Sequence, residues 1–355
     1  MTTAQPSMPA EWAPHERTWM AFPPPNGTFG EPDSPALAAA RRSWARVANT
    51  IAAYEPVTMV AGAGQGATAA ALLRPDVDVL EIPLDDAWMR DIGPSFVHED
   101  SAHTGLAAVD WAFNGWGGQG WAGWARDDRV AATVAGLAGY PVRRSALTME
   151  GGGFQVDGEG TVLLTETVQL DPGRNPGWTR EQVEAEIHAR LGTTTAIWLP
   201  RGLTRDYQAY GTRGHVDLVA CFLRPGVVAV HTQTDPAHPD FTVCREIADI
   251  LRSSTDAGGR RLRVVELLAP EESFDPGGEP VDYSYVNHYL ANDVLVLGAF
   301  GDPRDAAAAE VLGRAFPGRA VEFVDARGIF AHGGGIHCIT QQQPAARRRG
   351  APPCD

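Results

Sequence analysis

The sequence predicts an α/β protein in which five similar strand–helix–strand units are arranged around an axis. Segments that read as short apolar strands alternate along the chain with segments of helical spacing, an order typical of α/β architecture. The helical segments begin near residues 63, 127, 179, 241 and 304, about 60 residues apart, which indicates a repeated architecture. No GxGxxG or P-loop motif follows the first strand, and "GAGQGA" at 62–67 lacks the acidic residue of a dinucleotide site. These observations favour five units around an axis over a doubly wound sheet.

The five units follow one another in order, each with a helix between two strands. The helices are expected to begin near a cap-like Thr, Asp or Gly and to carry apolar residues three and four positions apart. The expected strand, helix and strand ranges are 57–62, 66–74 and 77–82; 107–114, 127–139 and 140–145; 161–166, 179–192 and 195–199; 227–231, 241–253 and 262–267; and 294–298, 302–316 and 320–324.

Composition and charge limit the kinds of partner. The 355 residues are 44% hydrophobic and 21% charged, with a formal net charge of -15, a balance that argues against nucleic acid and anionic membranes and suits a small cationic substrate. No apolar run reaches the ~18 residues needed to span a membrane, and the N-terminus lacks the basic and apolar regions of a signal peptide. We therefore expect a cytoplasmic protein, with a homo-oligomer left open.

Four cysteines are too few for a disulfide framework, and no two of them have CxxC spacing. Cys221 and Cys244 fall in strand and helix patterns and are expected in the core. Cys354 lies in a tail rich in Pro and Arg, residues 345–355, which we expect to be disordered. Residues 1–344 are expected to form a single catalytic domain.

A polar, glycine-rich segment follows the second strand of each unit. If rotation relates the units, the five segments reach one end of a common axis and form one pocket. The segments are 85–96, 148–154, 212–222, 281–293 and 332–338. The residues that this arrangement would bring together are Asp91, Glu150, His215, Asp217, Asn287 and Cys338.

These residue types point to one chemistry. A cysteine thiolate is a strong nucleophile, and a histidine can exchange protons with a leaving group and with water. Three carboxylates would repel an anion and attract a planar cation, and a guanidinium has forked N–H donors that suit carboxylates. The set indicates a thiol enzyme that attacks the central carbon of a guanidinium.

Several of these residues also have an ordinary structural interpretation. A lone cysteine is more often a buried structural residue, but the three glycines before Cys338 let the backbone approach a ligand closely. His215 and Asp217 are two apart, so on a strand they would point to the same face, or they form an ordinary surface pair. Asn287 would be structural in a Tyr-rich strand, and Glu150 a turn acid.

Three further features allow a structural and a functional interpretation. Asp91 follows Arg90 and would be only its ion-pair partner. The cluster "HGGGIHC" resembles a metal site, but it lacks a carboxylate or histidine pair at ligand spacing, so a metal hydrolase using His215, His332 and Cys338 is a weak alternative. Trp88 and the Trp-rich segment 111–124 would be either a packed loop or a wall beside a cationic ligand.

The chain resembles the agmatine deiminase family, which is related to bacterial peptidylarginine deiminase. The resemblance covers nearly the whole chain, and its blocks occur in the family's order. They are "MPAEWAPHERTWMAFP", "DDAWMRDIGPSFV", "VDWAFNGWGG", "MEGGGFQVDGEGTVLLTE", "IWLPRGL", "GHVD", "SYVNHYLAN" and "IHCITQQQP".

The resemblance implies a five-bladed α/β propeller, the pentein fold, and a hydrolase of linear amidines that needs no metal and no organic cofactor. It implies Cys338 as nucleophile, His215 as general acid and base, and a covalent thiouronium intermediate. Asp91 and Asp217 would hold the guanidinium nitrogens, and Glu150 would orient or charge the histidine. Agmatine would yield N-carbamoylputrescine and ammonia. Trp88, Asn287 and Gly335 are further expected substrate contacts.

Departures from the family pattern leave the substrate open. The segment before "GHVD" reads "LTRDYQAYGTR" instead of an acidic stretch, and Gly335 stands where the family commonly has Asn. A guanidine with a carboxylate, attracted by Arg213 or Arg205, is therefore an alternative, as are arginine derivatives and arginyl peptides. An amidinotransferase on the same fold, or a binding protein without catalysis, would also fit these residues.

Overall fold

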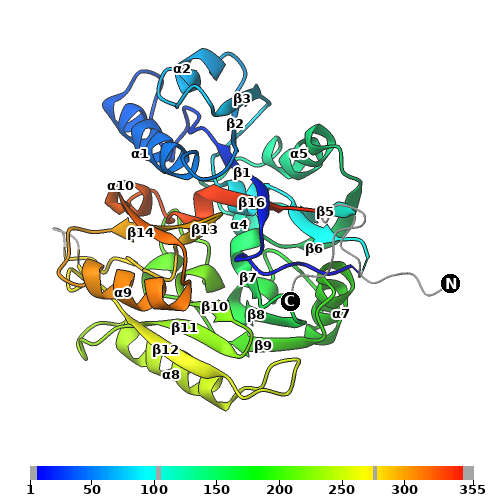
Figure 1. The fold of residues 1–355 in the computed structure, drawn as a ribbon, viewed down its shortest axis with the longest axis vertical. Helices are drawn as coiled ribbons and strands as arrows, with labels where there is room; N and C mark the ends of the chain where they lie inside the picture. Colours follow the sequence, from blue (N-terminus) through cyan, green and yellow to red (C-terminus); the bar gives the residue numbers. More distant parts are fainter. Residues whose placement is uncertain (1–5, 101–104, 275–277, 347–355) are drawn as a thin grey trace.

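The computed structural model describes residues 6–100, 105–274 and 278–346. Its strands form five small sheets, which lie around a common centre in Figure 1, with helices on the outside. Four sheets have three strands, in the orders β4-β5-β6, β7-β8-β9, β10-β11-β12 and β13-β14-β15. The fifth has the order β16-β1-β2-β3, so the last strand of the chain closes the ring beside the first. The five-bladed α/β architecture expected from the sequence is confirmed.

Each sheet repeats one pattern of pairing. In each sheet order, the first and second strands pair antiparallel, and the second and third strands pair in parallel. Strands β10, β11 and β12 are an example. The strands of the first two sheets are β1 (His15–Ala21), β2 (Val57–Ala61), β3 (Asp78–Glu81), β16 (Thr340–Pro344), β4 (Ser95–His98), β5 (Leu106–Ala112) and β6 (Val142–Thr148). Those of the remaining three are β7 (Phe154–Val156), β8 (Thr161–Thr165), β9 (Thr195–Leu199), β10 (Ala220–Arg224), β11 (Val227–Thr232), β12 (Arg263–Leu268), β13 (Tyr289–Ala291), β14 (Val294–Ala299) and β15 (Ala320–Asp325).

A helix lies in the crossover between the last two strands of each sheet, as parallel pairing requires. These crossover helices are α2 (Gly66–Ala70), α5 (Val130–Ala138), α7 (Arg180–Leu191), α8 (Asp240–Ser253) and α9 (Asp305–Ala315). The sequence signals are clearest in α7, where Thr179 and Gln182 form a capping box and Gly192 ends the helix with φ 70°. The helix expected over 66–74 is shorter, since α2 stops at Ala70.

Helix α1 (Pro35–Ile51) lies outside the five predicted units. Ser34 caps it by accepting a hydrogen bond from the Leu37 amide, and Pro35 fills its first turn, where no amide donor is needed. Shorter helices and 3₁₀ turns occur in the connections: α3 (Met89–Ile92), α4 (Gly115–Gly118), η1 (Asp127–Arg129), η2 (Gly151–Gly153), α6 (Glu166–Gln169), η3 (Thr204–Tyr207), η4 (Val216–Leu218), α10 (Arg327–Phe330) and η5 (His337–Ile339).

The predicted polar segments are the connections between neighbouring sheets. Each leaves the last strand of one sheet and enters the antiparallel strand of the next, and α3, η2, η4 and η5 lie in four of these connections. Two local expectations were wrong. His215 and Asp217 lie at the start of a 3₁₀ turn rather than on a strand, and Asn287 precedes β13 instead of lying in it. A tight turn rather than an extended strand therefore brings His215 and Asp217 of "GHVD" to the centre.

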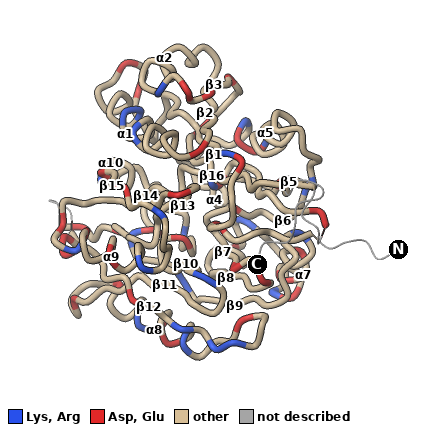
Figure 2. The backbone as a smooth tube through the Cα atoms, in the orientation of Figure 1, with Lys and Arg blue, Asp and Glu red and all other residues tan. Residues whose placement is uncertain are grey.

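The core runs through the ring and under the outer helices. Cys221 and Cys244 are buried in it, as expected. Charged residues of both signs occur around the described chain (Figure 2). Within the described residues, no helix combines the length and the apolar character needed to cross a membrane. The tail expected from residue 345 lies, from residue 347 onward, outside the described residues, and Cys354 lies there too.

Candidate active site

Cys338 lies in the 3₁₀ turn η5 and is buried. The Asn287 side-chain amide donates to its sulfur at 3.2 Å, and the Gly335 backbone amide donates to the same sulfur at 3.4 Å. The thiol faces Asp217 Oδ2 at 3.5 Å. Two N–H donors aimed at one sulfur are suited to stabilise a thiolate.

The glycines before the cysteine are needed for close packing. A Cβ on Gly334 would lie 2.7 Å from the Trp88 ring and 3.2 Å from the Cys338 sulfur. A Cβ on Gly335 would lie 2.3 Å from Asn287 Oδ1. Trp88, Asn287 and Gly335, the three further residues expected near the substrate, therefore lie in the immediate surroundings of the cysteine.

Polar atoms of His215, Asp91 and Asp217 converge beside Gly152. A Cβ built on Gly152 would lie 2.6 Å from His215 Nδ1, and 3.0 Å from both Asp217 Oδ2 and Asp91 Oδ1. Asp91 comes from α3, Gly152 from η2, and His215 and Asp217 from the segment at η4. Three connections thus place their polar groups around one point, and Asp217 Oδ2 joins that point to the sulfur.

Two buried atoms at this point have no hydrogen-bond partner within the described parts of the chain. They are His215 Nδ1 and Asp217 Oδ1. A buried polar atom without a partner costs free energy, on the order of 1–3 kcal/mol. A ligand with several N–H donors would satisfy Asp217 Oδ1.

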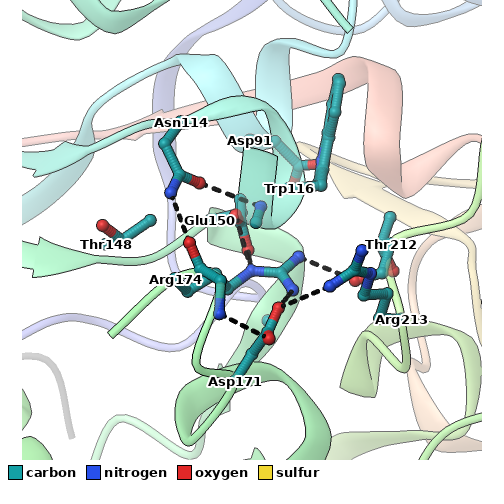
Figure 3. Close-up of polar contacts among 12 residues, drawn as sticks. Asp91, Asn114, Trp116, Thr148, Glu150, Asp171, Arg174, Thr212 and Arg213 are labelled. Atoms are coloured by element: carbon teal, nitrogen blue, oxygen red, sulfur yellow. Dashed lines mark hydrogen bonds and ion pairs between the residues drawn. The ribbon is translucent and has the colours of Figure 1, made fainter. Parts of the chain in front are cut away.

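Glu150, Arg174 and Asp171 form a buried ion-pair network (Figure 3). Glu150 lies 3.2 Å from His215 Nε2, and Arg174 Nε donates to both Glu150 oxygens at 3.0 and 3.1 Å. Arg174 also donates to Asp171 at 3.0 Å and to the Thr212 carbonyl at 2.7 Å. The sequence did not predict Arg174 and Asp171 as site residues, because neither belongs to a motif with a chemical signature.

The network sets the charge of the histidine. Burial opposes the ionisation of Glu150, but Arg174 and His215 lower its pKa to about 2. Burial also favours a neutral His215, yet Asp91 and Glu150 raise its pKa to about 9. His215 is therefore an imidazolium at neutral pH.

The pKa values of Asp91 and of the Cys338 thiol are raised, whereas that of Asp217 is lowered. Burial raises the pKa of Asp91 to about 6, although His215 and a Trp116 hydrogen bond of 2.9 Å oppose this shift. Burial likewise opposes ionisation of Asp217, but His337 and His215 lower its pKa. Burial, with the charges of Asp217 and Asp91, raises the pKa of the Cys338 thiol well above its usual value.

The contacts of Arg90 and Arg213 show whether Asp91 is only an ion-pair partner and whether Arg213 carries an uncompensated charge. Arg90 pairs with Glu11 at 3.5 Å, so Asp91 is not merely the ion-pair partner of Arg90. Arg213 pairs with Asp171 at 3.3 Å, and its charge is compensated there.

The cluster around His332 does not form a metal site among the residues described. His332 bonds the Thr28 carbonyl at 2.9 Å. In the described part of the chain, no group of three or more His, Cys, Asp or Glu could hold a metal ion.

Five sheets around a centre, with a thiol, an imidazolium and two carboxylates on their connections, define a guanidine-modifying enzyme of the α/β-propeller class. A family model described as Porphyromonas-type peptidyl-arginine deiminase matches residues 7–344. The chain belongs to this family, whose relatives include agmatine deiminases.

Individual relatives cover almost the whole chain. A protein named "Putative agmatine deiminase" from Streptomyces coelicolor is 63% identical over 337 residues, covering 95% of this chain and 98% of its own. Agmatine deiminase from Stutzerimonas stutzeri is 41% identical over 360 residues, covering 95% of each. The structure of agmatine deiminase from Enterococcus faecalis is 31% identical with a TM-score of 0.89, covering 98% of this chain and 99% of its own.

Proposed function

We propose that this protein hydrolyses agmatine to N-carbamoylputrescine and ammonia, with Cys338 as the nucleophile. The observation that carries the proposal is the buried cluster of His215, Asp91 and Asp217, which the Cys338 sulfur joins through Asp217 and in which two polar atoms lack partners among the residues described. The agmatine deiminases among the relatives support agmatine as the substrate.

Binding comes first. Asp91 and Asp217 bind the N–H groups of the guanidinium and keep it protonated, so its central carbon stays electrophilic. The same positive charge offsets the two carboxylates that raise the thiol pKa. The thiol of Cys338 therefore loses its proton to solvent more readily once the substrate is bound.

The first half-reaction forms a carbon–sulfur bond. The thiolate attacks the guanidinium carbon and gives a tetrahedral adduct. His215, an imidazolium, donates its proton to one terminal nitrogen, the carbon–nitrogen bond breaks, and ammonia leaves. The products of this step are a cationic S-alkylthiouronium on Cys338 and a neutral His215.

The second half-reaction uses the neutral histidine as a base. His215 takes a proton from water as the oxygen attacks the thiouronium carbon. The second tetrahedral adduct collapses, the carbon–sulfur bond breaks, and the thiolate of Cys338 is released. The remaining proton on oxygen passes to solvent water, which leaves the urea group of N-carbamoylputrescine.

A screen of guanidines tests the proposal. The purified protein is incubated with agmatine, arginine, methylated arginines, guanidino acids and arginyl peptides, and ammonia and the urea product are measured. Agmatine should be the best substrate, and Cys338→Ala should abolish turnover. Cys244→Ala, at a buried position of α8, is the matched control and should keep activity. Turnover by folded Cys338→Ala would contradict the assignment.

The screen also separates the alternatives. Preference for a guanidino acid would indicate that Arg213 binds the carboxylate of the substrate despite its pairing with Asp171. A new guanidine formed when a primary amine is added would indicate amidino transfer instead of hydrolysis.

We further propose that residues 1–344 act as one catalytic domain in the cytoplasm. The site supports a single domain, because its proposed catalytic residues, from Asp91 to Cys338, lie on connections between different sheets. A homo-oligomer stays a prediction, which size-exclusion chromatography with light scattering would test.

A further inference from the structure

His337, next to the nucleophile, lies between two carboxylates. Its Nδ1 is 2.8 Å from Asp217 Oδ2, and its Nε2 is 2.7 Å from Glu11 Oε1. An ionised carboxylate only accepts hydrogen bonds, so each ring nitrogen must carry a proton to bond its partner. The geometry therefore requires an imidazolium at His337, and the ring is buried.

Glu11 reaches this position from the N-terminal arm, residues 6–14, which precedes β1. Its side chain is 16% exposed, and Arg90 Nη1 lies 3.5 Å from the same oxygen that faces His337. Arg90 Nε also donates to the His337 carbonyl at 3.3 Å. The arm thus supplies a largely buried anion that neither the cysteine loop nor α3 provides.

The arrangement fixes the use of the two Asp217 oxygens. Oδ2 accepts from His337 and faces the Cys338 thiol at 3.5 Å. Oδ1 is buried without a partner in the described parts of the chain. Because the strong bond from His337 holds Oδ2, the carboxylate cannot rotate freely, and Oδ1 stays available for a guanidinium nitrogen.

We propose that Glu11 and His337 are positioning residues that act through a buried Glu11–His337–Asp217 chain. This chain holds the Asp217 carboxylate next to the Cys338 thiol and compensates the negative charge of Asp217. This inference rests on the proposed deimination, since Asp217 is taken to hold the guanidinium. Neither Glu11 nor His337 is a catalytic residue, because both act through Asp217.

The charges around His337 decide what loss of Glu11 would do. Burial and Arg90 favour the neutral ring, while Glu11 and Asp217 raise the pKa of His337. Two neighbouring titratable groups stay neutral near pH 7, since burial lowers the pKa of His288 to about 4 and raises the pKa of the Cys221 thiol. Without the Glu11 charge, Asp217 alone opposes burial and Arg90, and the pKa of His337 must fall.

A neutral His337 would change the two kinetic constants differently. Asp217 would lose its compensating charge and raise the pKa of the Cys338 thiol further, which slows attack. Binding of a cation at Asp217 would not weaken electrostatically. We therefore expect a lower kcat without a higher KM, a division that simple loss of packing would not produce.

Glu11→Gln, which keeps the shape of the side chain and removes its charge, tests the proposal. Its kcat should show an additional ionisation within the active pH range, with rates about tenfold lower on the alkaline side of that ionisation. The control is Glu16→Gln, an exposed residue of the same part of the chain that accepts from Tyr140 and Gln343. Its pH profile should match that of the wild type.

A second variant and a second measurement complete the test. In Glu11→Gln with His337→Gln, the additional ionisation should disappear, because its titrating group is gone. Nitrogen-15 NMR of labelled histidine should show His337 doubly protonated in the wild type and titrating in Glu11→Gln. A Glu11→Gln profile with the wild-type shape, or a singly protonated wild-type His337, would overturn the proposal. Because NMR needs no turnover, it decides the point even if agmatine proves not to be a substrate.

Discussion

At the scale of single residues, the site depends on charges that burial alone would remove. His215 remains an imidazolium because Asp91 and Glu150 surround it, and Glu150 remains ionised because Arg174 does. In the proposed mechanism, His215 must begin the reaction with a proton, and Asp91 must begin it without one.

The pH dependence follows from these two groups. Asp91 loses its charge as the pH falls through about 6, and His215 loses its proton as the pH rises through about 9. Because bound substrate offsets the charges that raise the thiol pKa, we expect kcat for agmatine to be bell-shaped, with an acid limb set by Asp91 and an alkaline limb set by His215. Steady-state rates across pH measure it, and a profile that still rises above about pH 10 would contradict the role of His215.

Arg174 gives a second prediction at this scale. Arg174→Lys keeps one positive charge but cannot bond Glu150, Asp171 and the Thr212 carbonyl together. We expect kcat to fall about 100-fold, within the range that a positioned general acid contributes. Arg180→Lys, a partly exposed partner of Glu166, should leave kcat unchanged. Equal kcat values for the two variants would show that the network does not position His215.

At the scale of elements, the connections between sheets matter more than the strands. Asp91, Glu150, His215 and Cys338 could be predicted because each lies in a polar segment that follows the second strand of a unit. Their local shape could not, since "GHVD" fits an alternating strand pattern as well as the observed 3₁₀ turn.

Residues that act through others were harder to find. Arg174 lies in an ordinary connecting segment and Glu11 in the first of the family's blocks, but nothing in their spacing distinguishes them from solvated surface charges. Only their burial beside Glu150 and His337 reveals them. The pairing of β16 with β1 could not be predicted either, because sequence order does not show which strand closes a ring.

Gly152 in η2 provides a prediction for an element. A methyl group there would lie 2.6 Å from His215 Nδ1 and 3.0 Å from an oxygen of each of Asp217 and Asp91. Gly152→Ala should therefore lose activity while the protein stays folded. Gly136→Ala, in α5, meets nothing within 4 Å and should keep activity and raise stability by about 0.5–1 kcal/mol. Denaturant unfolding and agmatine turnover test both, and an active Gly152→Ala would contradict the proposed binding position.

At the scale of the whole molecule, the ring makes one site from distant parts of the chain. The sheets place their connections at a shared centre, and crossover helices cover the outside (Figure 1). The N-terminal arm and the segment before the last strand both reach this centre, through Glu11 and through Cys338 just before β16. The approximate repeat in the sequence predicted this convergence, because elements related by rotation bring equivalent segments to one axis.

Covalent attack by the cysteine can be observed by mass spectrometry of the protein quenched with acid during a single turnover of agmatine. Attack by Cys338 predicts a transient mass increase equal to agmatine less ammonia, located on the peptide that contains this residue. Complete conversion of agmatine with no mass change on that peptide at any time point would contradict it.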